Sequence, residues 1–175
     1  MACSQTLAGI TNDCAPSMGG IVEALIANHA DVDSITETSG KITAITMVSS
    51  KKFYRYQLPR NTGSLSSNYT IDDTTGAKFV ASDLVLQVNR MDTAKRIEIS
   101  ALAQGELAII VKDANGLYWF LGKDAPVKAT AGDGLTGTAR ADRNGYSITL
   151  QDNSLELPLE ILTGTGGVDI DALVA

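Results

Sequence analysis

The chain has 175 residues, of which 44% are hydrophobic and 19% are charged. This composition fits one globular domain over residues 1–175 and excludes collagen, coiled coil and full-length disorder. Asp and Glu number 20 against 14 for Lys and Arg, which gives a formal charge of −6 and leaves too little basic material to grip nucleic-acid phosphates.

The sequence shows neither a membrane-spanning segment nor an export signal. The longest apolar stretches, such as 107–111, are about five residues long, far short of the roughly 20 that cross a bilayer. Residues 1–5 show no basic region followed by an apolar run, so no secretory signal is expected. We therefore expect a soluble protein made in a cytoplasm, with no membrane partner.

The first half of the chain predicts strands between polar segments. Residues 1–20 are small, polar and Gly-containing, and we expect them to form an N-terminal arm. Residues 60–77 are polar without strong periodicity, and we expect a long loop. β-Branched and aromatic residues predict strands at 41–48, 52–58 and 78–90, and at 21–27, where a helical turn is the alternative.

One helix is predicted at about residues 92–104. Asp92 can accept at the N-cap, the following residues contain no Gly or Pro, and Gly105 can take the left-handed position after the last turn. The apolar residues spaced three and four apart predict the stripe that packs on the core. These are Ala94, Ile97, Ala101 and Leu102.

Two Asn-Gly turns predict hairpins in the second half. The segment 113–116 joins 107–111 to 117–121, and 142–145 joins 137–141 to 146–150. Residues 163–175 are Gly-rich and then apolar, and we expect a C-terminal arm. The pattern of many short strands with one helix predicts a mainly β fold, a β-sandwich or partly closed barrel with one flanking helix.

Motifs for catalysis, cofactors and metals are weak. Gly132–Gly137 matches G-x-G-x-x-G by letter, but a short strand rather than a helix follows it. The two Asp-x-Asn-Gly turns lack the remaining ligands of a calcium loop. His29 is the only histidine, and Cys3 and Cys14 have no partner set for zinc. We therefore predict no catalytic, cofactor or metal residues.

Paired carboxylates are the remaining route to chemistry. Asp72 with Asp73, and Asp169 with Asp171, lie in polar segments. Aromatic residues make up only 5% of the chain, too few for the stacking platform of a sugar cleft. Solvated acidic residues are the favoured interpretation, and a glycan hydrolase is a minor alternative.

Three segments carry a family resemblance. They are MDTAKRIEISALA from Met91, AIIVKDANGLYWFLG from Ala108, and ADRNGYSITL from Ala141 to Leu150, continuing to Pro158. With Ala2-Cys3 and Gly19-Gly20-Ile21 at the N-terminus, they resemble virion structural proteins of tailed bacteriophages of Bacteroides-like hosts, most closely those of tail-tube type. The resemblance covers about two thirds of the chain and adds nothing at 49–77.

The resemblance implies a structural role. Subunits of this kind join edge to edge into rings, sixfold by analogy, and the rings stack into a tube through which DNA passes without specific binding. It implies a location in the virion tail, assembly in the host bacterial cytoplasm, and contact with other phage tail proteins. A tail terminator, head-completion or baseplate protein is the alternative within the same fold.

Two sets of residues are candidates, one for contacts between subunits and one for the lining of the lumen. The arms and the long loop are too polar to bury much surface within one subunit, so their apolar residues are expected to contact neighbouring subunits. These are Leu65, Ile71, Val168, Ile170 and Leu173. The acidic balance predicts an acidic or neutral lumen, with candidates Asp72, Asp73, Asp133, Asp152 and Glu156.

Overall fold

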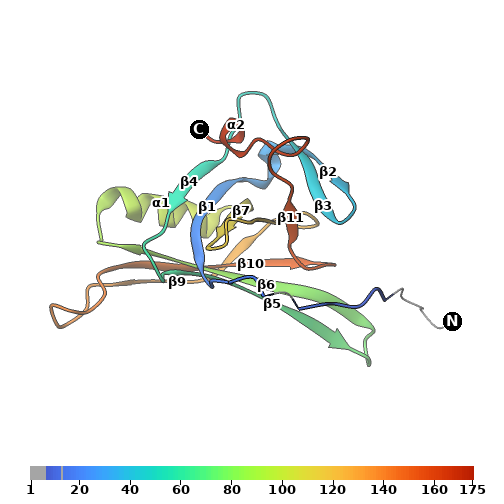
Figure 1. Cartoon of the computed structure of the whole chain (residues 1–175). Helices are drawn as coiled ribbons and strands as arrows, with labels where there is room; N and C mark the ends of the chain where they lie inside the picture. The colour runs from blue at the N-terminus through green and yellow to red at the C-terminus, as the bar shows by residue number, and fades with distance from the viewer. Residues whose placement is uncertain (1–6, 13) are drawn as a thin grey trace.

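The computed structural model describes residues 7–12 and 14–175, which fold into two packed β-sheets with one long helix beside them (Figure 1). The seven-stranded sheet has the order β2 (Val32–Thr38), β3 (Lys41–Met47), β11 (Leu159–Ile161), β8 (Tyr118–Leu121), β7 (Leu107–Asp113), β1 (Ile21–Asn28), β4 (Tyr54–Gln57). The four-stranded sheet has the order β5 (Gly63–Asp72), β6 (Ala77–Asn89), β10 (Gly145–Ser154), β9 (Lys128–Leu135). Over the described residues neither sheet closes into a barrel, so the mainly β, sandwich-like prediction is confirmed.

The first core cluster lies between the sheets. Strand alternation turns Leu84 and Leu86 of β6, and Ile148 and Leu150 of β10, toward the seven-stranded sheet. They meet residues of β1 and β7, and each such buried side chain contributes about 1.5–3 kcal/mol. The β1 and β7 residues in this cluster are Ile21, Ala24, Ile26, Leu107, Ile109 and Val111.

The opposite face of β1 and β7 is also buried. Leu25 and Ile110 point away from the four-stranded sheet into a second core cluster, which includes Phe53, Val168 and Ile170. Buried faces on both sides explain why β7 reads as the continuous apolar run Leu-Ala-Ile-Ile-Val rather than as an alternating strand.

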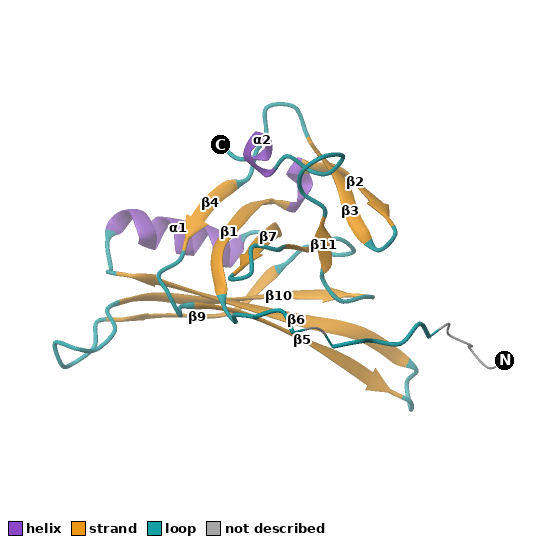
Figure 2. Cartoon of the chain, in the orientation of Figure 1, coloured by secondary structure: helices purple, strands orange, loops and turns teal. Residues whose placement is uncertain are grey.

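Helix α1 (Thr93–Gln104) begins where predicted and lies beside β9 and β10 (Figure 2). The Asp92 carboxylate accepts a hydrogen bond from the backbone N–H of Lys95 at 2.9 Å, which caps the first turn. The left-handed conformation predicted at Gly105 is wrong, because its φ is −83° and the chain extends directly into β7. A Cβ at Gly105 would lie 2.9 Å from Leu107 Cδ2, so close packing accounts for the glycine.

The predicted packing face of α1 is also wrong. Ile99 and Leu102 contact the first core cluster, whereas Ile97 is 55% exposed. Neighbouring helix positions differ by about 100°, so Ile97 and Ile99 lie on different sides of the helix. The side with Ile99 and Leu102 buries two large apolar side chains, whereas the side with Ile97 adds only Ala94 and Ala101. Of the predicted stripe only Leu102 is buried, and Ala94 and Ala101 are exposed.

The first predicted hairpin is confirmed. β7 pairs antiparallel with β8, Gly116 has φ +88°, and the Asp113 carboxylate accepts from the N–H groups of Asn115 and Leu117 at 2.9 Å. The second hairpin joins β9 to β10, but its first strand ends at Leu135 rather than spanning 137–141.

The expected long loop at 60–77 is wrong, because most of it forms β5. This ten-residue strand pairs with β6 along its whole length, and the chain reverses tightly between Asp72 and Ala77. Its Ser, Thr and Asn residues suit an exposed strand at the edge of a sheet, where little apolar surface is needed.

The expected C-terminal arm at 163–175 is wrong as well. Val168 and Ile170 are only 6% and 7% exposed, and the short helix α2 (Ile170–Leu173) packs over the second core cluster. Backbone hydrogen bonds join Phe53 to Leu173 and Ala175 at 2.9 and 3.0 Å. The segment covers a sheet face that would otherwise be apolar and open to water.

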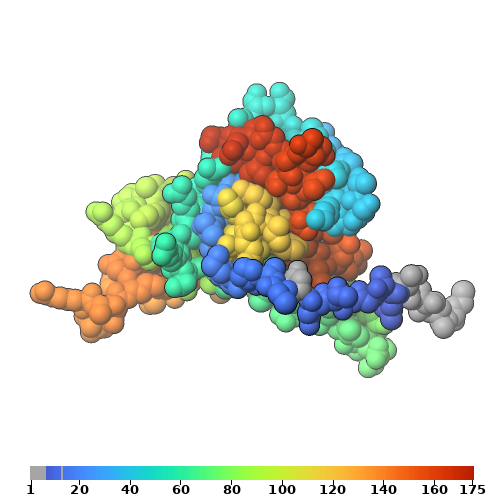
Figure 3. Space-filling view, in the orientation of Figure 1, coloured from blue at the N-terminus to red at the C-terminus, as the bar shows by residue number. Residues whose placement is uncertain are grey.

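The described part of the N-terminal segment lies outside the two sheets, as predicted for an arm. Residues 7–12 and 14–19 are exposed and form no helix or strand, and Figure 3 shows this segment running along the body toward one end. Asn115 holds its base through two hydrogen bonds to the Met18 backbone, at 2.8 and 3.0 Å. Residues 1–6 and 13 lie outside the described residues.

Candidate assembly surface

The outer face of the four-stranded sheet is a broad polar surface. Because side chains alternate, the residues between the core-facing positions of β5, β6 and β10 point away from the molecule. Most of them carry hydroxyl, amide or small apolar groups. They are Ser64, Ser66, Asn68, Thr70 and Asp72 of β5, Phe79, Ala81, Asp83, Val85 and Gln87 of β6, and Ser147, Thr149, Gln151 and Asn153 of β10.

Few charges lie on this face, and their partners are close. Gln151 donates to Asp83 at 2.8 Å, directly across the β6–β10 pair. At the rim, Arg143 binds Asp133 at 3.1 Å. Asp72 accepts hydrogen bonds from Thr75 and Thr74, which lower the pKa of its carboxyl and keep it ionised. The face is therefore polar, weakly acidic and without a basic patch.

Both edges of this sheet are open in the part of the chain that the structure describes. β5 pairs only with β6, and β9 pairs only with β10. All three pairings are antiparallel, so β5 and β9 run in opposite directions. If β5 of one copy meets β9 of another related by rotation, the antiparallel pattern continues across the contact. Open strand edges of this length are templates for pairing with another chain.

The predicted lumen residues separate into two groups. Asp72 and Asp133 lie on or beside the outer face, and Asp73 lies in the exposed β5–β6 turn. Asp152 is wrong as a lumen residue, because it points inward and is 2% exposed. Glu156 lies in the connection after β10 and binds Lys123, away from the outer face.

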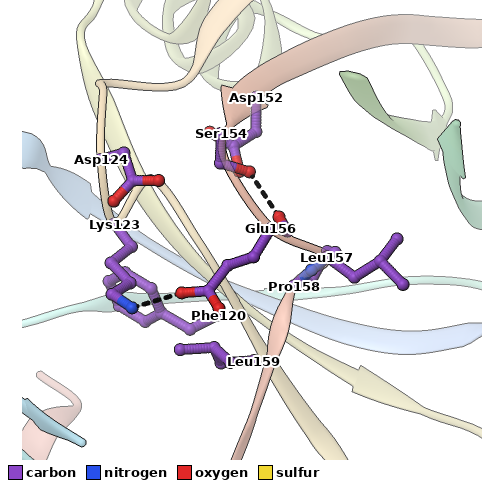
Figure 4. A pocket seen from close by; sticks show the side chains of 9 residues that line it. All are labelled: Phe120, Lys123, Asp124, Asp152, Ser154, Glu156, Leu157, Pro158 and Leu159. Carbon is purple, nitrogen blue, oxygen red and sulfur yellow. Dashed lines mark hydrogen bonds and ion pairs between the residues drawn. The ribbon is translucent and has the colours of Figure 1, made fainter. Parts of the chain in front are cut away.

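Asp152 lines a small cavity at the end of β10 (Figure 4). The cavity volume is about 10 Å³, room for about one water molecule. Burial raises the pKa of the Asp152 carboxyl, hydrogen bonding from Gly122 and Ser154 opposes that rise, and its Oδ1 atom has no protein partner. Although Asp124 and Glu156 also line it, the cavity does not admit a sugar ring.

The predicted interface residues are mostly internal. Val168 and Ile170 are buried, and Leu173 packs against the second core cluster. Leu65 packs against the first. Val168 and Ile170 are wrong as interface residues because they are buried within the subunit, whereas Leu65 and Leu173 are half-buried. Ile71 alone of the five stays open, with 62% of its surface exposed.

The sequence contains a signal for the polar face that composition alone does not reveal. In β5, Leu65, Tyr69 and Ile71 occupy alternate positions, and hydroxyl or amide residues stand between them. This is the period of a strand with one polar face. The signal is weak because Ser67 interrupts the apolar positions, where it pairs with the buried Ser82 at 2.8 Å.

Comparisons of this chain with protein-family models, with curated proteins and with solved structures found no match. Among the described residues, no helix is long and apolar enough to span a membrane. Over the same residues, no three His, Cys, Asp or Glu side chains form a group that could hold a metal ion.

Proposed function

We propose that this protein is the structural subunit of a bacteriophage tail tube. Copies of the chain join into a homo-oligomeric ring through β5 of one subunit and β9 of the next, and the rings stack around a central conduit for DNA. The observation that carries the proposal is a four-stranded antiparallel sheet with two open edges and a polar outer face.

Sheet closure explains both open edges at once. The contact joins two different surfaces, so it is head-to-tail and closes into a ring when the rotation permits. Each subunit adds four strands, an even number, so antiparallel pairing continues around the barrel. A sixfold ring, as the resemblance implies, exceeds the roughly 16–18 strands at which barrels already enclose an aqueous channel.

The chemistry of the outer face supports its placement toward DNA. Hydroxyl and amide groups present neutral, hydrated surface, and the charges are mainly acidic. A phosphate backbone gains no counterion release from such a wall, so DNA passes without being held. The opposite face of the sheet cannot take this position, because it carries the first core cluster.

Cysteine cross-linking tests the ring contact. Within one subunit, β5 and β9 are three strand spacings apart, ~14 Å, which is too far for a disulfide. Ala131→Cys on β9 is combined in turn with Ser64→Cys, Ser66→Cys, Asn68→Cys or Thr70→Cys on β5, in a chain whose Cys3 and Cys14 are replaced by serine. Oxidation at one of these registers gives covalent oligomers that end at the closed ring.

The matched control pairs Ala131→Cys with Ala81→Cys on the central strand β6, whose edges are already occupied. This pair gives no oligomers. Absence of cross-links at every β5 register, in protein that light scattering shows to be monomeric, would refute the ring. Electron microscopy of the same material separates stacked tubes from the single rings of a terminator or head-completion protein.

A further inference from the structure

The two ends of the four-stranded sheet carry complementary surfaces. One end is the β5–β6 hairpin, which extends beyond the seven-stranded sheet (Figure 1). The other end holds the β9–β10 connection and α1. Ten residues of β6 separate the position opposite Ile71 from the position opposite Tyr146, a span of ~34 Å.

The hairpin end exposes apolar side chains. Tyr69 and Ile71 are 61% and 62% exposed, although they lie on the same side of β5 as Leu65, which packs on the core. Tyr69 of β5 and Ser154 of β10 both pair with Val80 of β6. Leu155, which follows Ser154, is 77% exposed. The seven-stranded sheet does not extend over Tyr69 and Ile71, so one side of the hairpin presents an apolar surface to water.

The opposite end contains a groove between α1 and the β9–β10 pair, with a volume of about 420 Å³. Ile99 and Ala103 form one wall, and Tyr146 and Ile148 form the other. The floor stays open because Gly134 has no side chain, and a Cβ there would lie 3.0 Å from the Tyr146 ring.

Charged residues flank the apolar surfaces at both ends. Lys78 stands directly opposite Ile71 on β6 and is exposed. Asp133 lies at the rim of the groove, on the outer-face side of β9, and binds Arg143 at 3.1 Å. The hairpin turn also carries Asp72 and Asp73, so the match between the two ends lies in their apolar surfaces and not in their charges.

We propose that the β5–β6 hairpin of one subunit, through Tyr69 and Ile71, docks in the α1–β9 groove of a subunit in the next ring. This inference rests on the proposed function. When β5 and β9 edges close a ring, the strand ends become its two faces, so the hairpin and the groove lie on opposite faces. A contact between unlike ends leaves a new hairpin and a new groove open, and the stack continues.

Two substitutions test the contact from its two sides. Ile71→Asp places a charge on the docking surface, and Ala103→Trp fills the groove at an exposed helix position. Each raises the protein concentration required for half-maximal tube assembly at least about tenfold, equivalent to about 1.4 kcal/mol, and leaves rings intact. Turbidity and electron microscopy measure the tubes, and light scattering measures the rings.

Matched controls occupy exposed positions outside both docking surfaces. Val48→Asp adds the same charge beyond the end of β3, and Ala101→Trp adds the same bulk on a different side of α1. Both controls assemble as the parent protein does. Tubes that form normally from both Ile71→Asp and Ala103→Trp would overturn the docking and leave the ring untouched. Failure of the parent protein to form rings would overturn the proposed function instead.

Discussion

Ile170 and Ile71 were both predicted to be contact residues between subunits, and the structure gives them opposite roles. Ile170 is 7% exposed within the second core cluster, whereas Ile71 is 62% exposed. Replacing a buried Ile by Ala costs about 2–5 kcal/mol, from lost burial and the residual cavity. Because Ile170 lies in a short segment near the surface that can relax, we expect about 3 kcal/mol. Ile71→Ala changes stability by at most about 0.5 kcal/mol.

Urea unfolding of the unassembled protein measures this difference. Trp119 is the only tryptophan and packs against the first core cluster, so its fluorescence follows unfolding of the seven-stranded sheet. With a slope of about 2 kcal/mol per molar urea, Ile170→Ala lowers the midpoint by about 1.5 M, and Ile71→Ala by at most about 0.25 M. Equal, small shifts would refute the assignment of residues 163–175 to the core.

Three further predictions concern the turn positions and the buried acid. Gly145→Ala prevents correct β6–β10 pairing, since its Cβ would lie 2.0 Å from the Val88 carbonyl oxygen, and the variant should be recovered only as aggregate. Burial raises the pKa of the Asp152 carboxyl in the folded state, so ionisation of this carboxyl destabilises the parent protein above the ordinary pKa of 3.8. Asp152→Asn should therefore become more stable than the parent as pH rises, and the urea midpoints of the two proteins should converge in acid. Asp113→Ala removes the acceptor of the Trp119 indole N–H, at 3.2 Å, and of two turn N–H groups, so it shifts the emission maximum and lowers stability by about 1–2 kcal/mol.

Local sequence signals were sufficient for much of the fold. β-Branched runs placed β1, β3 and β6, and the Asn-Gly pair at 115–116 placed the β7–β8 hairpin. In each case the residues within the element satisfy its own periodicity or turn geometry, so no distant contact is needed to recognise it. The N-cap of α1 belongs to the same class.

Long-range packing decided what the sequence did not predict. Val168 and Ile170 look like an apolar tail until the second buried face of β1 and β7 is known. The packing side of α1 depends on where the helix meets β9 and β10, which its own stripe of apolar residues does not specify.

The lumen candidates were selected by charge, whereas the polar outer face of the four-stranded sheet is recognised from strand pairing. Asp72 and Asp133 stay lumen candidates because they lie on or beside the polar outer face, whereas Asp152 was selected for its charge and lies inward. Alternation along β10 places position 152 on the same side as Leu150, which the acidic composition could not indicate.

Electron cryomicroscopy of the assembled protein tests the central claim most directly. The account predicts stacked rings in which the four-stranded sheets form one continuous antiparallel wall, with Ser66, Asp83 and Thr149 facing the central channel. An assembly whose channel is lined by α1 or by the seven-stranded sheet would contradict it, as would a chain of residues 1–175 that remains monomeric at every concentration.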